Sequence, residues 1–258
     1  MGGLSLNLNS SNLKTKLNKV DRSKFNIKSP LNEILVGILL GDGHVQKRSL
    51  NGNSRFMYGQ SSLRIHHLNY FKHVLNLFKP YLSETFKLKE KTFKDNRTNN
   101  TYKSVNFSTL SLPCFNQYKS LFYKNNKKIV PINIQELLTP IGLAYWIMDD
   151  GSIQNKGLHL NTYAFNSEDV LKFKSTALLP CPSQLKLTEG LGENLFGNNS
   201  LKCSIHKHKK GNRIYIFGES MDIFRNNISV HMHEDMLYKL NSNLRTTTLC
   251  APAGKQNK

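Results

Sequence analysis

The chain has 258 residues, enough for one large domain or for two domains of about 120 to 130 residues each. Hydrophobic residues make up 38% of it, which supports a packed core and excludes wholesale disorder. The 36 Lys and Arg residues outnumber the 17 Asp and Glu, giving a formal net charge of +19. Such an excess is typical of proteins that bind a polyanion, with nucleic acid ahead of an anionic membrane surface. A basic protein that is merely soluble is the plain alternative.

The positive charge is unevenly distributed along the chain. Residues 1–128 hold 22 Lys and Arg against 6 Asp and Glu, and residues 129–258 hold 14 against 11. The net charges of the two halves are therefore +16 and +3. We expect a polyanion to bind the first half more strongly than the second.

Cysteine spacing and apolar runs exclude two further classes of protein. The four cysteines form no C-x-x-C pair, which argues against a disulfide scaffold and favours a reducing compartment. Cys203, His206 and His208 leave a zinc site open as an alternative to a strand with solvent-facing histidines. No apolar run approaches the ~20 residues that span a bilayer, so we expect no membrane partner.

The N-terminal segment is rich in Lys, Asn and Ser. Residues 4–24 are nearly free of acid, a composition that weakly resembles an organellar transit peptide. However, Leu4, Leu6 and Leu8 alternate rather than following helical spacing. We therefore predict a flexible basic arm over residues 1–28.

Residues 29–43 predict a short buried helix. Ser29 supplies a hydroxyl N-cap, and Pro30 stands at the first helical position. The next residues are almost wholly apolar for roughly three turns, so the helix must be buried on most faces. It stops at Asp42-Gly43, where glycine suits the left-handed conformation past a helix end.

The elements that follow are expected to form a sheet and its helices. Residues 54–60 and 102–107 alternate apolar with polar or basic residues, which predicts strands with one face on a core and one exposed. Residues 68–78 have the spacing of an amphipathic helix. Between them, residues 87–100 predict a basic hairpin loop.

The same order of elements returns in the second half of the chain. Thr139 and Pro140 begin a second apolar helix that stops at Asp150-Gly151, and strand patterns at 158–163 and 213–217 flank a helix at 168–173. Asp42 and Asp150 are 108 residues apart, a longer period than any solenoid repeat. We predict an α+β protein with halves at 29–136 and 137–245 and a tail at 246–258. Small residues in both apolar helices would let them pack closely at the centre, namely Gly37, Gly41, Gly142 and Ala144.

Carboxylates at two equivalent helix ends are the main chemical signal. The helix dipole disfavours an acid at a helix C-terminus by ~0.3–1 kcal/mol, yet Asp42 and Asp150 both stand at such a position. If the helices lie side by side, the carboxylates meet, and two like charges together indicate a bound divalent cation such as Mg²⁺. Asp-Gly as an ordinary turn dipeptide is the alternative for either instance alone.

Two longer motifs contain these acids, at residues 35–43 (LVGILLGDG) and 143–151 (LAYWIMDDG). They resemble the paired motifs of LAGLIDADG homing endonucleases, and residues 138–151 match a subgroup with the pattern L-T-P-x-x-L-A-Y-W-x-M-D-D-G. The similarity extends over roughly residues 31–240. Leu40 replaces the family's first Asp and Tyr145 its central Gly, but the last acid of each motif is retained.

This resemblance implies a fold and a set of metal ligands. The fold would be two pseudo-symmetric αββαββα halves with saddle-shaped antiparallel sheets in the DNA major groove and the motif helices at the interface. Asp42 and Asp150 would bind Mg²⁺ with the carbonyls of Gly41 and Asp149, with roughly two or three ions shared between the half-sites.

The family also places one lysine near each half-site. By position these resemble Lys128 and Lys239, which lie 86 residues after Asp42 and 89 after Asp150. Such a lysine would stabilise developing phosphorane charge or polarise the attacking water. Lys127 is the rival to Lys128, and an ordinary solvated lysine is the alternative for each.

Basic and amide side chains near the predicted strands are expected to contact DNA, because Arg and Lys read guanine edges and Gln and Asn read adenine. The sequence does not separate base contacts from phosphate contacts. In the first half the candidates are Lys47, Arg48, Arg55, Tyr58, Gln60, Arg64, His66, Lys89, Lys91, Lys94, Arg97 and Lys103. In the second half they are Gln154, Lys156, His159, Asn161, Lys207, Lys209 and Arg213.

Together these patterns predict a monomeric, Mg²⁺-dependent endonuclease that cuts both strands of a long DNA target. Three alternatives remain: a maturase that binds intron RNA, a catalytically silent DNA-binding protein and a membrane-surface protein. Retained acids argue against the first two as sole functions, and the lack of a basic amphipathic helix with a broad apolar face argues against the third. The abundance of Asn, Lys, Ile and Phe is typical of an AT-rich organellar genome, so we expect a mitochondrial or other organellar protein.

Overall fold

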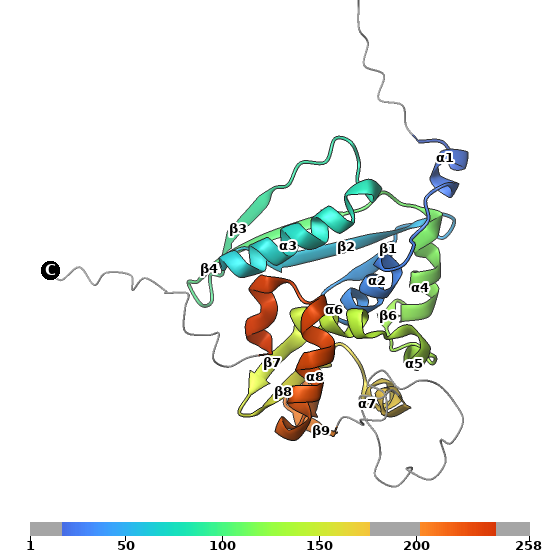
Figure 1. Ribbon diagram of the computed structural model, residues 1–258. Coiled ribbons are helices and arrows are strands. Elements are labelled where there is room, and N and C mark those ends of the chain that lie inside the picture. The colour runs from blue at the N-terminus through green and yellow to red at the C-terminus, as the bar shows by residue number, and fades with distance from the viewer. Residues whose placement is uncertain (1–16, 176–201, 241–258) are drawn as a thin grey trace, which may run out of the picture.

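A computed structural model describes residues 17–175 and 202–240, which contain two series of elements in the same order (Figure 1). The first comprises α2 (Leu31–Leu40), β1 (His44–Lys47), β2 (Ser54–Ser61), α3 (Ile65–Leu77), β3 (Glu90–Lys94), β4 (Thr101–Ser108) and α4 (Asn116–Phe122). The second comprises α6 (Pro140–Asp150), β7 (Gly151–Gln154), β8 (Gly157–Asn161), α7 (Ser167–Leu171), β9 (Cys203–His208), β10 (Gly211–Ile216) and α8 (Met221–Ile228). The predicted pair of αββαββα halves is confirmed.

Each half contains one four-stranded antiparallel sheet. The strand orders are β1-β2-β4-β3 and β7-β8-β10-β9, so the two halves share their topology as well as their element order. Side chains alternate between a core face and an outward face. Phe56 and Val105 mark the core face of the first sheet, and Leu160 and Ile214 mark that of the second. Figure 1 shows α3 lying across the first sheet.

Helices α2 and α6 pack against each other where the halves meet. A Cβ atom placed on Gly37 would lie 1.8 Å from the carbonyl oxygen of Gly142, and one placed on Gly142 would lie 2.9 Å from that of Glu33. Only glycine allows backbone to approach backbone this closely. The predicted close packing of the two apolar helices is therefore confirmed at these glycines.

The ends of the motif helices differ from the prediction in two respects. Thr139 caps α6 as expected by accepting from the Gly142 N–H. The N-cap of α2 is Pro30, and the Ser29 hydroxyl donates to the Glu33 carboxylate. The prediction of a left-handed conformation for the glycine after the helix is also wrong, since Gly151 has a φ of −72° and begins β7. Gly43 and Gly151 are needed for space, because a Cβ there would lie 2.9 and 2.7 Å from a helix carbonyl oxygen.

The segment before α2 is packed in part against the first half. Residues 17–28 include helix α1 (Lys19–Ser23), Arg22 Nη1 donates to the carbonyl of Ser111 at 2.8 Å, and the Tyr81 hydroxyl donates to that of Asn26 at 2.7 Å. The prediction of a flexible arm is therefore wrong for residues 17–28. Residues 1–16 and the predicted tail at 246–258 lie outside the described residues.

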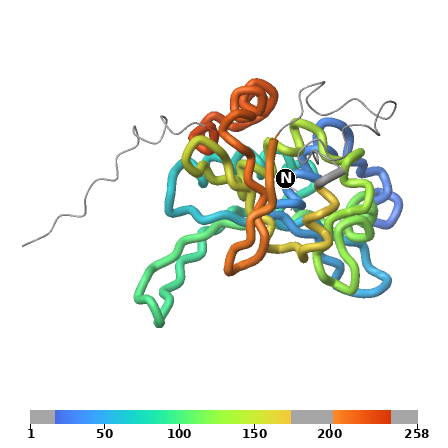
Figure 2. Tube along the Cα trace, turned by 90° about the horizontal axis from the view of Figure 1, so that it is seen from below, coloured from blue at the N-terminus to red at the C-terminus, as the bar shows by residue number. Residues whose placement is uncertain are grey.

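The predicted basic loop at 87–100 is largely a strand and its turn. Strand β3 pairs with β4 through Lys94↔Thr101, and residues 95–100 form the tip. Figure 2 shows this hairpin extending away from the body of the molecule. Lys91 and Lys94 are therefore held on a strand. In the described ranges, no helix is long and apolar enough to cross a membrane.

Candidate functional site

Three aspartates meet at the C-terminal ends of α2 and α6. Asp42 follows α2 directly after its C-cap Gly41, and Asp149 and Asp150 are the last two residues of α6. The backbone N–H of Asp42 donates to Asp149 Oδ2 at 3.1 Å, which joins the two halves at this point. The structure therefore brings together the two predicted acids, Asp42 and Asp150, and adds a third carboxylate between the halves.

Crowding and burial change the protonation of these acids. Removal from water, followed by the charge of Asp42, raises the pKa of Asp150 to about 7. Burial also raises the pKa of Asp42, although its side chain keeps solvent exposure, and the pKa of Asp149 is raised by burial and then by the other two acids. Such a cluster binds a positive charge strongly, because a cation relieves both the repulsion and the desolvation.

A lysine lies beside each helix end. Lys128, on β6 (Lys127–Lys128), donates to the carbonyls of Gly41 at 2.7 Å and Gly43 at 3.0 Å. Lys239, in a 3₁₀ helix (Glu234–Lys239), donates to the carbonyls of Met148 at 2.5 Å and Asp149 at 2.9 Å. The two predicted lysines therefore occupy matching places in the two halves.

Burial weakens the proton affinity of both lysines. It lowers the pKa of Lys128 to about 8 and also lowers that of Lys239, while the three acids act in the opposite direction. Lys127, the rival to Lys128, is exposed and lies on the other side of the same two-residue strand. The geometry favours Lys128 as the first-half lysine.

The first sheet supplies further hydrogen bonds to this cluster. Gln60 Nε2 donates to Asp42 Oδ2 at 2.6 Å and to the Tyr58 hydroxyl at 3.1 Å, and that hydroxyl donates to Asp149 Oδ1 at 2.8 Å. Tyr58 is 1% exposed, so the prediction that it lies on the DNA-facing surface is wrong. Gln60 likewise points to the core side of β2, where it holds Asp42.

The second half makes a different set of contacts. His44 and Ser152 each lie two residues after the acid of their motif, and they pair with Met57 and His159. The next residues along the two strands, Tyr58 and Leu160, therefore correspond to each other. Leu160 is apolar and buried. Asn161, a predicted DNA contact, donates to the backbone carbonyl of Asp150 at 3.0 Å, and the Trp146 side chain lowers the pKa of the Asp150 carboxyl.

The donor set fits a hard divalent cation that keeps part of its water shell. Within residues 17–175 and 202–240, no three His, Cys, Asp or Glu side chains are arranged to hold a metal by themselves. Two carboxylates and two carbonyls, from Gly41 and Asp149, converge at the helix ends. Each carbonyl has a second lone pair beyond the one used by lysine. Mg²⁺ is commonly bound by one or two carboxylates, with water and phosphate completing its shell.

The outward face of the first sheet carries basic, amide and aromatic groups. Arg55 Nε and Nη2 donate to Gln46 Oε1 at 3.0 and 2.6 Å, and pairing places both on this face. Phe93 and Tyr102 stack with ring centroids 5.2 Å apart while remaining 58% and 38% exposed. The face therefore combines charge with rings that can stack on a base.

The outward face of the second sheet is richer in histidine. The rings of His159, His206 and Tyr215 lie with centroids 4.8 to 5.6 Å apart. His159 is 7% exposed, so the neighbouring rings cover this predicted DNA contact. Cys203 lies on the core face of β9, opposite His206 and His208, so the zinc alternative fails on strand alternation.

The remaining predicted DNA contacts divide by exposure. Arg55, Arg213 and His66 are half-buried, and His66 lies on α3 against the Tyr238 ring rather than on a sheet. Lys103 forms an ion pair with Glu90 at 3.2 Å. Like Lys103, the others are exposed: Lys47, Arg48, Arg64, Lys89, Lys91, Lys94, Arg97, Gln154, Lys156, Lys207 and Lys209.

Sequence reasoning missed several side chains on the two outward faces. Gln46, Tyr102, His206 and Tyr215 all lie there. Strict alternation about the buried residues of each strand would have identified them, since Tyr215 stands between Ile214 and Ile216.

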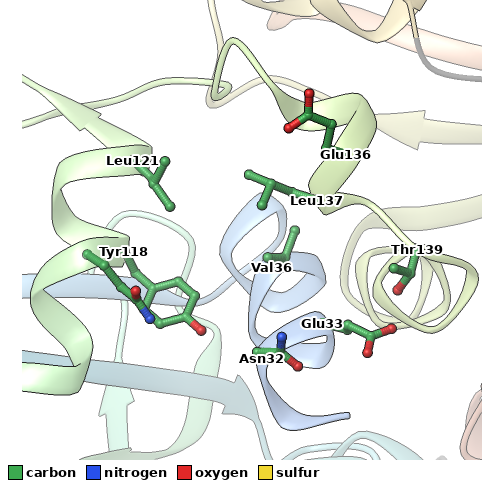
Figure 3. Close-up of a pocket in the computed structure, with 9 residues that line it drawn as sticks. Asn32, Glu33, Val36, Tyr118, Leu121, Glu136, Leu137 and Thr139 are labelled. Carbon is green, nitrogen blue, oxygen red and sulfur yellow. The ribbon is translucent and has the colours of Figure 1, made fainter. Parts of the chain in front are cut away.

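A cavity of about 260 Å³ lies near the opposite end of α2 from the acids. Figure 3 shows Asn32, Glu33 and Val36 of α2 lining it, together with Tyr118 of α4 and Leu137 of α5 (Ile134–Leu137). None of the three aspartates or two lysines of the site lines this cavity.

Comparisons with known proteins agree with this arrangement. The chain is 31% identical over 249 residues to the cytochrome b mRNA maturase bI2 of Saccharomyces cerevisiae, covering 93% of this chain and 53% of that longer protein. It is 27% identical over 218 residues to the DNA endonuclease I-ChuI of Chlamydomonas applanata, covering 81% and 93%.

A solved structure shares the fold. The homing endonuclease I-WcaI, bound to its DNA recognition sequence, superposes with a TM-score of 0.68 at 23% identity, covering 86% of this chain and 91% of that one. Residues 32–176, more than half of the chain, match the family model described as the LAGLIDADG DNA endonuclease family. Both motifs, at residues 35–43 and 143–151, fall inside that match with their acids, and the chain belongs to the LAGLIDADG DNA endonuclease family.

Proposed function

We propose that this protein is a monomeric, site-specific endonuclease that cuts both strands of a long DNA target with Mg²⁺. The observation that carries the proposal is the meeting of Asp42 and Asp150 at the ends of α2 and α6, with one lysine anchored beside each helix end. A protein that only bound nucleic acid would not require this cluster of acids, whose burial and mutual repulsion oppose ionisation.

The cation would be held by the carboxylates of Asp42 and Asp150 and by the carbonyls of Gly41 and Asp149. When bound, Mg²⁺ supplies an activated water and stabilises the leaving oxygen of a phosphodiester. Because the acids lie at the interface, both halves would contribute ligands to the cations, and each strand of a duplex would meet one half-site.

Lys128 and Lys239 would act on the scissile phosphates. Each ammonium group is anchored to helix-end carbonyls, which fixes its position before DNA arrives. A preorganised positive charge in a partly dry site stabilises the extra negative charge of the pentacoordinate phosphorus transition state. One lysine in each half matches a reaction carried out once on each strand.

The two outward faces would lie along the duplex. Exposed lysines and arginines on the β3–β4 hairpin would contact phosphates, and Arg55 and Gln46 would present donors and acceptors to base edges. I-WcaI, which shares the fold, is a DNA-bound homing endonuclease. This likeness supports a DNA partner for the present chain.

A maturase function is the second candidate, because the relatives in Saccharomyces cerevisiae and Debaryomyces hansenii are named cytochrome b mRNA maturases. Intron RNA would then be a second partner of the same chain. The names of these relatives, together with the AT-rich type of composition, support an organellar and specifically mitochondrial location.

The test is cleavage of a randomised plasmid library by the purified protein with Mg²⁺, followed by mapping of the breaks. We expect double-strand breaks at one long sequence, none in EDTA, and binding without cutting in Ca²⁺. Cutting at full rate in EDTA, or no breaks at any sequence, would contradict the proposal. High-affinity binding and splicing of an intron RNA without DNA cleavage would favour the maturase instead.

A further inference from the structure

Asp149 occupies, in the second motif, the position that Gly41 occupies in the first. The proposed function uses only its backbone carbonyl. Its carboxylate points into the other half of the molecule, where Oδ2 accepts from the Asp42 N–H at 3.1 Å and Oδ1 accepts from the Tyr58 hydroxyl at 2.8 Å. This carboxylate therefore joins the end of α6 to the first motif and the first sheet.

The hydrogen bonds form a closed ring around Asp42. From the Tyr58 hydroxyl the ring continues through Gln60 Nε2, which donates to that hydroxyl at 3.1 Å and to Asp42 Oδ2 at 2.6 Å. Both the backbone and the carboxylate of Asp42 are thus fixed, and Asp149 is the one member that comes from the second half. Three of the four acceptor atoms in the ring belong to the carboxyl groups of Asp149 and Asp42.

The second half cannot build the mirror image of this ring. A Cβ on Gly41 would lie 2.5 Å from Asp149 Oδ2 and 2.6 Å from Asp149 Cβ, so there is no room for a second carboxylate at the matching position. Leu160, which corresponds to Tyr58, has no hydroxyl to donate. Only one of the two catalytic acids can therefore be held across the interface in this way.

We propose that Asp149 is a positioning residue that holds Asp42 in place, so that the two half-sites cut their strands unequally. This inference rests on the proposed function. The side chain of Asp149 makes and breaks no bond in the reaction. It acts as an acceptor for the Asp42 N–H, and an amide oxygen can replace it in that role.

Four variants separate this role from others. Asp149→Ala removes the acceptor, Tyr58→Phe removes only the hydroxyl that holds it, and Asp149→Asn keeps an acceptor without the charge. Tyr81→Phe is the matched control, because the Tyr81 hydroxyl is also held in the first half but donates to the Asn26 carbonyl, away from the acids.

Amide hydrogen exchange of Asp42 in the metal-free protein measures the ring directly. We expect exchange at Asp42 to be up to about tenfold faster in Asp149→Ala, as loss of one hydrogen bond implies, and moderately faster in Tyr58→Phe. It should stay near the parent value in Asp149→Asn and in Tyr81→Phe. Unchanged exchange at Asp42 in Asp149→Ala would overturn the proposal.

Strand-resolved cleavage measures the consequence. With a duplex labelled on each strand, we expect Asp149→Ala and Tyr58→Phe to slow the same strand about tenfold more than the other, with DNA affinity in Ca²⁺ unchanged. Asp149→Asn should retain most of the activity, whereas Asp42→Asn should not.

Two outcomes would overturn the assignment of a positioning role. Equal slowing of both strands would show that Asp149 serves the half-sites alike, and an Asp149→Asn variant as inactive as Asp42→Asn would make the carboxylate a metal ligand. If the parent protein cut no DNA, the proposed function would fail, while the exchange experiment would still decide whether Asp149 holds Asp42.

Discussion

The two halves of the molecule share an element order and a sheet topology, yet they hold their acids differently. In the first half, a side chain from the sheet reaches the Asp42 carboxylate through Gln60. In the second half, the corresponding strand reaches only the Asp150 backbone, through Asn161. Their outward faces also differ. The first carries Arg55 and the basic hairpin, and the second carries a cluster of histidine and tyrosine rings. The two halves thus share the frame of the site but differ in the side chains that hold its acids.

The largest expected effect is on the acids, where the halves should behave alike. Asp42→Asn or Asp150→Asn keeps the shape of the side chain but removes charge that holds the cation, so each should abolish double-strand cleavage. DNA affinity, measured by gel shift in Ca²⁺, should stay within about tenfold, because phosphate contacts dominate binding. A variant that still linearises the target at the parent rate would remove its acid from the metal site.

Loss of a lysine should affect the halves separately. Lys128→Met and Lys239→Met each remove one preorganised charge, so each should slow cleavage roughly 10²–10³-fold and accumulate nicked plasmid. Sequencing of the nicks should show opposite strands for the two variants. The control is the exposed neighbour, and Lys127→Met should cut like the parent. An inactive Lys127→Met with an active Lys128→Met would show that the assignment is one residue out of register.

An alanine substitution at the contact between the motif helices should destabilise the protein more in α2 than in α6. A Cβ on Gly37 would overlap the Gly142 carbonyl at 1.8 Å, whereas one on Gly142 would meet a carbonyl at 2.9 Å. We expect Gly37→Ala to lower the free energy of unfolding by about 3 kcal/mol, as for severe overpacking. Gly142→Ala should cost less, because alanine also recovers ~0.5–1 kcal/mol of helix propensity. Urea unfolding of both variants measures the difference, and an equal cost would contradict it.

The smallest expected effect concerns the charge asymmetry. Alanine at four basic residues of the first-half hairpin should reduce DNA affinity more than alanine at four exposed lysines of the second half. Each lost phosphate contact should also reduce the log–log salt slope by ~0.9. The first set is Lys89, Lys91, Lys94 and Arg97, and the second is Lys156, Lys207, Lys209 and Lys210. Equal losses would show that local geometry, not net charge, governs the binding of each half.

The frame of the site was predictable because local signals repeat. Two apolar helices that end in Asp-Gly predict a buried pair and its acids, whereas Lys128 and Lys239 were predicted from the resemblance to the family. The predicted DNA contacts on β2 did not follow strand alternation, because they included residues from both faces of the strand. Arg55, on one side of β2, cannot share a face with Tyr58 and Gln60, because successive side chains point to opposite faces.

The role of the Asp149 side chain was beyond reach of the sequence. Its partners are Tyr58, 91 residues away, and the backbone N–H of Asp42, 107 residues away, and the motifs predict neither hydrogen bond. Such contacts depend on how closely two helices approach, which side-chain patterns alone do not fix. The packing of residues 17–28 was missed for the same reason, since Arg22 binds a backbone carbonyl 89 residues away.

The glycine contact between α2 and α6 also sets a length. Because backbone meets backbone there, the separation of the two helix ends depends on rigid peptide groups and not on side chains that can change rotamer. In the proposed nuclease, the helices would therefore fix the distance between the two cutting positions. The two nicks should then be separated by the same number of base pairs on every target sequence. The single-stranded ends that cleavage leaves should therefore have a constant length.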